Sequence, residues 1–303
     1  MNDLSVRFEG VSKKYRHFAL DNINLELRAG TIMGFIGANG AGKSTTIRIL
    51  MGLVQQDAGA VHVLGHSIPE GQVAAKLDIG FVSEDMRLYG AATLRWHMEF
   101  IRSIYPRWDQ RYAEELSRRF DLKPQQKIKG LSHGQRVKAT LLLALARRPR
   151  LLVLDEPTTG LDPVARKEVL GELMAVLADE DRTILFSSHN TLDVEQISDQ
   201  ITFIDRGRII DSDGKEVFLD RWRRLRLRLR PNAPLPELPG IVEIGGSGQL
   251  PVLTTNRFEP AMVSACADIG VTVQAVDSMT LEEIFLANVH SRRTRADLEG
   301  ATV

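Results

Sequence analysis

The sequence is poor in cysteine: its 303 residues include only Cys266, so the chain can form no internal disulfide. A lone cysteine fits a reducing compartment, and we interpret Cys266 as a small buried apolar residue rather than a reactive thiol. A net charge is also lacking, because 39 Lys and Arg residues balance 39 Asp and Glu residues. No overall field therefore draws the protein to nucleic acid or anionic lipid, and a charged ligand must be held locally.

Long apolar runs are missing as well. The longest, residues 141–146, has six residues, whereas a helix that spans a bilayer needs about 20. The N-terminus also lacks the basic start and apolar core of a secretion signal. With 43% apolar and 26% charged residues, the composition is that of a globular protein. We therefore expect a cytosolic chain that does not cross a membrane by itself.

Two short segments near the N-terminus alternate between apolar and polar residues. Residues 4–8 and 23–27 follow the period of two that is typical of half-buried strands. We expect the segment between them, residues 11–21, to form a turn.

Buried-type strands alternate with helices in the main part of the chain. Residues 31–36 form an apolar run that ends in glycine-rich sequence, and residues 47–54 then follow a helical period. Two further strand patterns, 151–154 and 183–186, are separated by a helical stretch over 163–177. This alternation predicts an α/β fold whose parallel sheet is covered by helices on both faces.

A helical insert interrupts the alternation over residues 93–129. Apolar residues recur at helical spacing over 94–105 and 112–120, and Pro106 and Pro124 break the pattern. The insert therefore predicts a separate group of helices beside the sheet.

The composition changes after residues 205–208, whose Asp-Arg-Gly-Arg sequence is typical of a hairpin turn. The Leu-Arg repeat at 225–230 predicts a strand with buried leucines and a solvated arginine face, which we prefer to a nucleic-acid or lipid site. Residues 231–240 hold four prolines and are expected to form a connector. We expect one domain over 1–218 and a small C-terminal α/β accessory domain over 219–303. Its strands are expected near 223–229, 241–244, 250–254 and 271–275, and its helices near 259–268 and 280–288.

A phosphate-binding motif follows the strand at 31–36. Residues 37–45 match G-x-x-x-x-G-K-[ST] between a predicted strand and a predicted helix. Glycines let backbone N–H groups approach phosphate oxygens, and the helix N-terminus adds a favourable dipole. Lys43 is expected at the β- and γ-phosphates, and Ser44 is expected to offer its hydroxyl to Mg²⁺. The predicted nucleotide-binding residues of this loop are Gly37, Asn39, Gly40, Ala41, Gly42, Lys43, Ser44 and Thr45.

Two carboxylates follow the apolar strand at 151–154, at the edge of the sheet where open α/β proteins bind their ligands. Asp155 is expected to hold Mg²⁺ through water, and Glu156 to orient or deprotonate the attacking water. An apolar run that ends in Asp-Glu is weak evidence alone. Together with the phosphate loop it indicates a nucleoside triphosphatase.

A third motif narrows that class. Residues 131–135, Leu-Ser-His-Gly-Gln, precede a long helical stretch and resemble the signature loop of ABC ATPases. Tyr15 matches that family's adenine-stacking aromatic residue, Asp162 its dimer-contact aspartate, and His189 its switch histidine. These features occur in the family's order over residues 1–215.

The resemblance implies a P-loop NTPase domain of the ABC type, with a mostly parallel core sheet, an antiparallel β subdomain and a helical subdomain over about 85–135. It also implies a head-to-tail homodimer, in which the signature loop of each chain caps the γ-phosphate of ATP held by the other. ATP and Mg²⁺ are then the cofactors, and hydrolysis loosens the dimer. The signature residues expected to contact the partner's nucleotide are Leu131, Ser132, His133, Gly134 and Gln135.

Two positions depart from the family pattern. Glu84 stands where a glutamine usually reaches Mg²⁺; it remains an oxygen ligand but adds negative charge near the phosphates, which favours slower or differently gated hydrolysis. His133 replaces a glycine, and either it places a positive charge beside the partner's phosphate or it points to solvent. The sequence leaves both alternatives for His133 open. Because the other motif residues are present, we predict that the chain hydrolyses ATP.

Two functions fit these motifs. One is the ATPase subunit of an ABC transporter, docked beneath separate transmembrane permease subunits on the cytoplasmic face of the cell membrane. The other is a soluble ATP-driven clamp on ribosomes or DNA. A single cassette, one cysteine and no heptad tract favour the transporter, so we expect no nucleic-acid partner.

The sequences of residues 158–163 and 278–286 are similar to the corresponding segments of bacterial ABC-2 type exporter ATPases, and this resemblance implies export. The cargo is not predicted, because its specificity lies in the membrane subunits. The accessory domain either stabilises the dimer or regulates it, or it is a tail without such a role. The sequence leaves these alternatives open.

Overall fold

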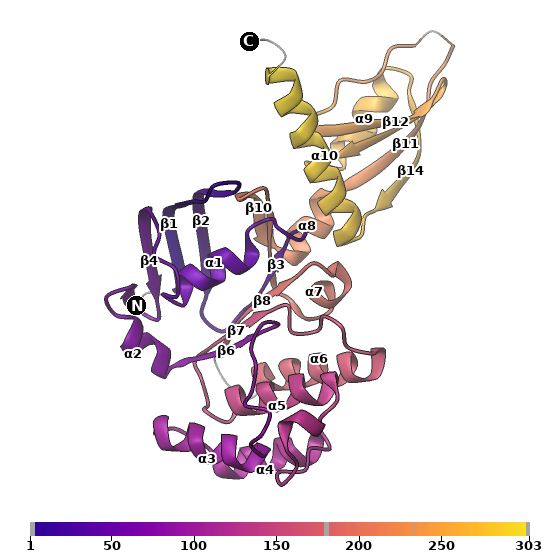
Figure 1. The fold of residues 1–303 in the computed structure, drawn as a ribbon. Coiled ribbons are helices and arrows are strands. Elements are labelled where there is room, and N and C mark those ends of the chain that lie inside the picture. The colour runs from indigo at the N-terminus through magenta and orange to yellow at the C-terminus, as the bar shows by residue number, and fades with distance from the viewer. Residues whose placement is uncertain (1–3, 179–181, 232, 301–303) are drawn as a thin grey trace. The chain divides into compact units, whose positions relative to one another are not determined.

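The computed structural model describes residues 4–178, 182–231 and 233–300, and the chain forms two units, Met1–Ser212 and Asp213–Val303 (Figure 1). The division precedes residue 218 because helix α8, Lys215–Arg221, belongs with the C-terminal elements. Its Phe218 and the following Trp222 are both fully buried. In the predicted connector, residue 232 lies outside the described residues, and the others form neither helix nor strand.

A six-stranded sheet forms the centre of the first unit. Its order is β10-β9-β3-β8-β7-β6, and β3 pairs in parallel with β8 and β9, as β7 does with β6 and β8. Every residue of β3, β7 and β8 is buried, which confirms the prediction of a buried parallel sheet. The bounds are β3 Ile32–Ile36, β6 Ile79–Ser83, β7 Leu151–Asp155, β8 Thr183–Ser188, β9 Gln200–Asp205 and β10 Arg208–Gly214.

The turn between β9 and β10 consists of Arg206 and Gly207, whose φ angles are 45° and 76°. Two consecutive positive φ angles are the mark of a type I′ turn, whose twist suits a two-residue hairpin. The predicted hairpin turn at 205–208 is therefore confirmed.

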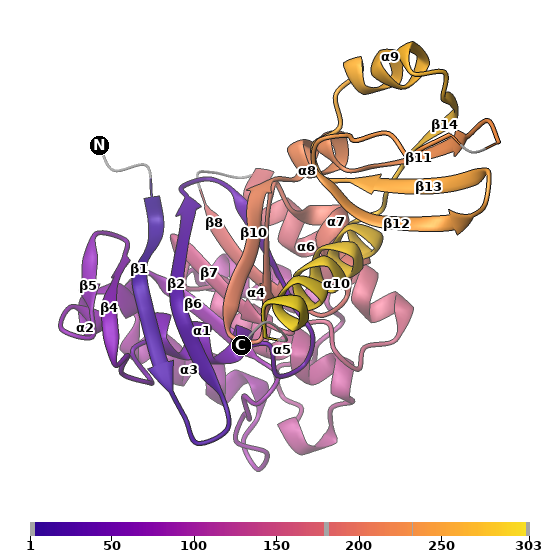
Figure 2. The ribbon, with the colours of Figure 1, turned by 90° about the horizontal axis from the view of Figure 1, so that it is seen from above.

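A second, antiparallel sheet in the order β2-β1-β4-β5 lies in the same unit, with its strands side by side in Figure 2. The predicted turn over 11–21 is wrong in its length, because β1 continues to Lys14 and β2 begins at Ala19. Register shifts in β1 break the period of two, while Val11 and Leu20 stay buried in the core. The bounds are β1 Leu4–Lys14, β2 Ala19–Arg28, β4 Ala58–Val63 and β5 His66–Ile68.

Two helices, α3 and α4, form within the predicted insert, and both contact α5, which follows it in the chain (Figure 1). Thr93 and Asp109 cap α3 and α4 by accepting hydrogen bonds from backbone N–H groups, so each helix begins where its sequence provides a cap. No helix within the described parts of the chain is long and apolar enough to span a bilayer. The helices of this unit are α1 Lys43–Leu50, α2 Gln72–Leu77, α3 Leu94–Ile104, α4 Gln110–Arg119, α5 His133–Leu145, α6 Pro163–Ala178 and α7 Thr191–Ile197.

The second unit has its own four-stranded sheet, in the order β12-β13-β11-β14. Leu225 and Leu227 of β11 are buried, whereas Arg226 is exposed and pairs with Asp277 at 2.6 Å, which confirms the predicted amphipathic strand. Cys266 is buried in this core, and burial raises the pKa of its thiol. The bounds are β11 Arg223–Arg228, β12 Ile241–Ser247, β13 Leu250–Thr255, β14 Thr272–Ser278, α9 Ala261–Asp268 and α10 Leu281–Gly300.

Candidate nucleotide-binding site

The phosphate loop connects β3 to α1 and depends on its glycines. Gly40 and Gly42 have φ angles of 80° and 118°, values that residues with a Cβ atom rarely adopt. A Cβ on Gly37 would lie 2.5 Å from the carbonyl oxygen of Ile204. Gly42 is the N-cap of α1 and offers no side chain to its first N–H groups. These groups are therefore available to an anion at the helix N-terminus.

Lys43 is only 5% exposed, and its amino group is held in the loop. Its Nζ donates a hydrogen bond to the carbonyl oxygen of Gly37 at 2.7 Å. The same Nζ forms an ion pair with Oε1 of Glu156 at 3.0 Å. The structure thus joins the phosphate loop to the residue that follows β7.

Glu156 lies at the centre of the site and is 8% exposed. Its φ angle is 54°, an uncommon conformation for a residue with a side chain. Its Oε2 accepts hydrogen bonds from Nδ1 of His189, at 2.8 Å, and from Oγ1 of Thr159, at 3.1 Å. His189 follows β8, so three separate segments meet at this one carboxylate.

Oxygen donors gather beside this cluster. Asp155 is the last residue of β7, and its Oδ1 accepts a hydrogen bond from the hydroxyl of Ser187 at 2.8 Å. Glu84 follows β6, the parallel neighbour of β7, and its backbone N–H donates to the Asp155 carbonyl oxygen at 3.1 Å. Ser44 is half-buried in the first turn of α1. Hydroxyl and carboxylate oxygens suit Mg²⁺. No three His, Cys, Asp or Glu side chains of the described segments lie close enough together to hold a metal ion by themselves.

Tyr15 lies in the turn between β1 and β2 and is 46% exposed. Its ring stacks on Phe18 with 6.4 Å between the ring centroids. Phe18 borders the phosphate loop, because a Cβ on Gly42 would lie 3.1 Å from its Cζ. The turn therefore presents an exposed aromatic ring beside the loop, where a flat base could stack.

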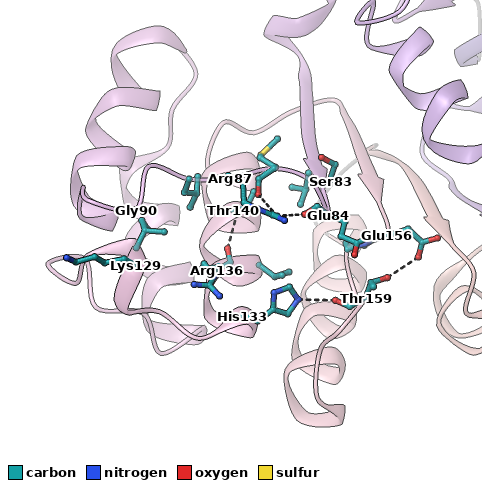
Figure 3. A pocket seen from close by; sticks show the side chains of 16 residues that line it. Ser83, Glu84, Arg87, Gly90, Lys129, His133, Arg136, Thr140, Glu156 and Thr159 are labelled. Atoms are coloured by element: carbon teal, nitrogen blue, oxygen red, sulfur yellow. Dashed lines mark hydrogen bonds between the residues drawn. The ribbon is translucent and has the colours of Figure 1, made fainter. Parts of the chain in front are cut away.

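The signature loop begins α5. Ser132 is the N-cap and forms a capping box with Gln135, and Leu131 is buried beneath them. His133 is exposed, and its Nε2 donates a hydrogen bond to the carbonyl oxygen of Thr159 at 3.1 Å (Figure 3). Gly134 lies near Ala165, at 3.4 Å from an added Cβ.

A cavity of about 410 Å³ is lined by residues of both the signature loop and the central cluster (Figure 3). Its lining includes Glu84, His133, Arg136, Glu156 and Thr159, but no residue of the phosphate loop. The structure therefore brings Lys43, Glu156 and His189 together, and it leaves the signature N-cap outside that contact.

The model of the ABC transporter family matches residues 20–159. The daunorubicin resistance ATP-binding protein DrrA3 of Streptomyces coeruleorubidus is 30% identical over 94% of this chain and 96% of its own. The ABC transporter ATP-binding protein YtrB of Bacillus subtilis (strain 168) is 33% identical over 90% of this chain and 94% of its own. The chain belongs to the ABC transporter ATP-binding proteins.

Solved structures agree with this assignment. An ATP-binding subunit of an ABC transporter has a TM-score of 0.65 and 25% identity, covering 71% of this chain and 92% of that one. CbiO1 of Clostridium perfringens, part of the ABC transporter complex CbiONQ, has a TM-score of 0.62 and 25% identity, covering 72% and 91%. The fold of this ABC ATPase is thus the P-loop fold that its motifs predict, and its reaction is the hydrolysis of ATP.

Asp162 of the ABC ATPase has a role within the chain. Its Oδ1 accepts hydrogen bonds from the backbone N–H groups of Val164 and Ala165, at 2.9 and 3.0 Å, at the start of α6. These bonds, with that of Ala165 the strongest, hold the pKa of the Asp162 carboxyl below its usual value. Contact of Asp162 with a second chain stays a prediction.

Sequence reasoning missed one buried residue of the site, Asp193 of α7. Its Oδ2 accepts a hydrogen bond from the hydroxyl of Thr158 at 2.7 Å, and its Oδ1 pairs with Nε of Arg166. Asp193 is 3% exposed and ties the helix after His189 to the turn after Glu156. Its position four residues after His189 was the available signal, but a single acidic residue on a short helix does not stand out.

Proposed function

We propose that this ABC ATPase powers export through separate membrane-spanning subunits, and that ATP is held between two copies of the chain. The observation that carries the proposal is the buried cluster in which Lys43 contacts Glu156 and Glu156 contacts His189. The cluster joins a phosphate-binding loop to a carboxylate that can accept a proton. Relatives named as a daunorubicin resistance protein and as Nod factor export proteins support the direction of transport.

The cluster suggests how ATP starts the reaction. Lys43 occupies Oε1 of Glu156, while His189 and Thr159 hold Oε2. The β- and γ-phosphates carry more charge than one carboxylate and draw the lysine toward themselves. Oε1 is then free to accept the proton of the attacking water, and His189 keeps the carboxylate in place.

The other predicted residues complete the nucleotide site. Tyr15 stacks on the adenine, and the loop N–H groups bind the phosphates. Ser44, Asp155 and Glu84 would hold Mg²⁺, which neutralises charge on the phosphate oxygens when it is bound. The negative charge of Glu84 offsets part of the positive charge that Mg²⁺ would bring to the phosphates, and so slows hydrolysis or changes its gating.

A second copy supplies the remaining donors. Ser132 and the N–H groups at the start of α5 form an anion site that has no phosphate loop beside it in the same chain. In a head-to-tail homodimer, this site caps the γ-phosphate bound by the partner, and Asp162 lies at the contact. Dimerisation then depends on ATP.

A groove beside the helical insert offers a docking place for a membrane subunit. Met86, Leu88, Ile101 and Tyr105 are among the residues that line a hollow of about 270 Å³. On helix α3, which also carries Ile101, the side chains of Trp96 and Phe100 are about half-exposed, and their rings stack with 5.3 Å between the ring centroids. An apolar helix of a permease subunit fits such a surface, and docking would place the chain on the cytoplasmic face of the membrane.

The test of hydrolysis is the Glu156→Gln variant. We expect the purified protein, with its membrane subunits where these are required, to hydrolyse Mg-ATP, and the variant to lose at least about 100-fold in rate because it has no base. The variant should also accumulate as an ATP-bound dimer in analytical ultracentrifugation. Glu114→Gln, an exposed position on α4, is the matched control and should keep the rate. Robust turnover by Glu156→Gln would contradict the role of Glu156.

The test of transport is the identity of the partner. Affinity purification of the chain from detergent-solubilised membranes should recover a protein with about six apolar segments of roughly 20 residues each. Recovery of ribosomes or DNA in place of such a protein would contradict the transporter and support a clamp.

A further inference from the structure

His133 makes a contact that the usual glycine at this position has no side chain to make. It is the first residue of α5, and its Nε2 donates to the carbonyl oxygen of Thr159 at 3.1 Å. The ring also lies against Gly160, whose φ is 71° and whose added Cβ would be 3.2 Å from Nε2. The exposed imidazole thus links the start of α5 to the turn that follows Glu156.

The contact continues to the centre of the site. The hydroxyl of Thr159 donates to Oε2 of Glu156 at 3.1 Å, and the same oxygen accepts from His189 at 2.8 Å. Figure 3 shows the two consecutive bonds, from His133 to Thr159 and from Thr159 to Glu156. The two hydrogen bonds of Thr159, one at its carbonyl oxygen and one at its hydroxyl, therefore connect the start of α5 with the carboxylate of Glu156.

We propose that His133 is a positioning residue that couples the two ATP sites of the dimer. The inference rests on the proposed function, because the start of α5 binds the partner's nucleotide only in a head-to-tail dimer. When α5 engages the partner's γ-phosphate, His133 moves with it and shifts the Thr159 peptide. The Thr159 hydroxyl then sets the direction of Oε2 of Glu156 in its own site.

The mechanism has a specific kinetic signature. Hydrolysis in one site becomes dependent on ATP in the other, so the rate rises cooperatively with ATP concentration. Loss of the His133 contact leaves Glu156 less well directed, which lowers kcat. It leaves ATP binding nearly unchanged, because within the described residues Lys43 contacts Gly37 and Glu156, and Tyr15 contacts Phe18, rather than the turn at 158–162.

The experiment compares His133→Ala with His133→Gln, since glutamine keeps an N–H donor of similar reach. We expect His133→Ala to lose roughly threefold to tenfold in kcat with KM changed less than about twofold, and to bring the Hill coefficient for ATP close to one. His133→Gln should recover most of both. Equal kcat and Hill coefficient in wild type and His133→Ala would overturn the proposal, as would a loss confined to KM.

A second pair of variants tests the route. Thr159→Val removes the hydroxyl and keeps the shape, so the double variant with His133→Ala should lose no more than Thr159→Val alone. Multiplied losses would show two independent effects and defeat the coupling. Failure of the proposed function would give a different result. The wild-type protein would then not hydrolyse ATP, and the Glu156→Gln variant would not form an ATP-bound dimer.

Discussion

Glu156 combines three features that are unfavourable one by one: a positive φ angle, burial and a charge. A residue with a side chain loses about 1 to 2 kcal/mol in the left-handed region, and a buried carboxylate needs partners. Lys43, His189 and Thr159 provide them. Strain at such a position is typical of functional sites, where the surroundings fix a conformation that the chain would not choose.

The ion pair predicts the effect of Lys43→Met on the nucleotide-free protein. The variant leaves Glu156 buried without its cation, so we expect the free energy of unfolding to fall by roughly 3 kcal/mol. Urea unfolding measures it. In the double variant with Glu156→Gln the loss should be smaller, because no charge stays unpaired.

Lys138→Met is the matched control for this ion pair. Lys138 pairs with Glu168. The Lys138 side chain is 13% exposed but that of Glu168 is 45% exposed, so water can solvate the carboxylate that is left, and removing the pair costs less than about 1 kcal/mol. Equal losses in Lys43→Met and Lys138→Met would argue that the Lys43 pair gains nothing from burial.

The site residues that could be predicted are those within contiguous motifs. Lys43 and Glu156 have roles that follow from a loop pattern and from the end of an apolar strand. The partner of His133, the Thr159 carbonyl, could not be predicted, because 26 residues separate them and only the packing of α5 brings them together. The same holds for Asp193, whose partners lie on other segments.

At the scale of elements, Glu172 joins helix α6 to helix α4. It is 4% exposed, accepts a hydrogen bond from the Tyr112 hydroxyl at 3.3 Å and pairs with Nη2 of Arg119 at 2.9 Å. Burial raises the pKa of Glu172 above 4.5, although Arg119 and Tyr112 act in the opposite direction. Burial, together with Glu172, raises the pKa of Tyr112 to about 12, so its hydroxyl remains a donor.

These shifts predict a pH-dependent stability. The folded protein binds the Glu172 proton more tightly than the unfolded chain, so its contribution is complete below about pH 4.5 and is lost as the pH rises through the elevated native pKa. Glu172→Gln has no such proton. The free energy of unfolding of wild type minus that of the variant should therefore decrease between pH 4.5 and 7, as measured by urea unfolding at several pH values.

Glu115→Gln provides the control on the neighbouring helix, because Glu115 pairs with the same Arg119 at 3.5 Å but is 51% exposed. We expect its difference from wild type to change by less than about 0.5 kcal/mol over that range. A difference for Glu172→Gln that grows with pH would contradict the sign of the shift.

Strands with a strict period of two and helices with clear stripes were predictable, and so was the parallel sheet. The antiparallel strands β4 and β5 were not, because Ala58–Val63 begins with the small residues Ala-Gly-Ala and His66–Ile68 has only three residues, too few to show a period. The order β10-β9-β3-β8-β7-β6 was not predictable either. Strand order depends on tertiary pairing, whereas periodicity reports only which face of a segment is buried.

At the scale of the whole molecule, each unit has a hydrophobic core of its own. The core of the first contains Val153 and Leu185 of the central sheet, and that of the second contains Leu225 and Cys266. All the predicted site residues belong to the first unit. The second unit contributes none of the predicted site residues.

The edge of the second sheet suggests a role for this unit. Strand β12 is an outer strand of the second sheet. Its Ile244 is 59% exposed, and Leu250, the first residue of the adjacent strand β13, is 52% exposed. Exposed apolar residues on an outer strand favour pairing with another chain. We therefore favour a dimer-stabilising role for residues 213–303 over a tail without function.

Removal of residues 213–303 tests this role, and the cut belongs after Ser212 because α8 contacts α10 and belongs to the second unit. Circular dichroism should show that residues 1–212 stay folded, since their core is intact. In the Glu156→Gln background with ATP, the dissociation constant of the truncated dimer should rise at least about tenfold, the effect of losing about 1.4 kcal/mol of contact. Sedimentation velocity over a concentration series gives both constants. If the folded fragment dimerises as tightly as the full chain, the accessory unit contributes nothing to the dimer, and the ATP-bound interface alone holds the two copies together.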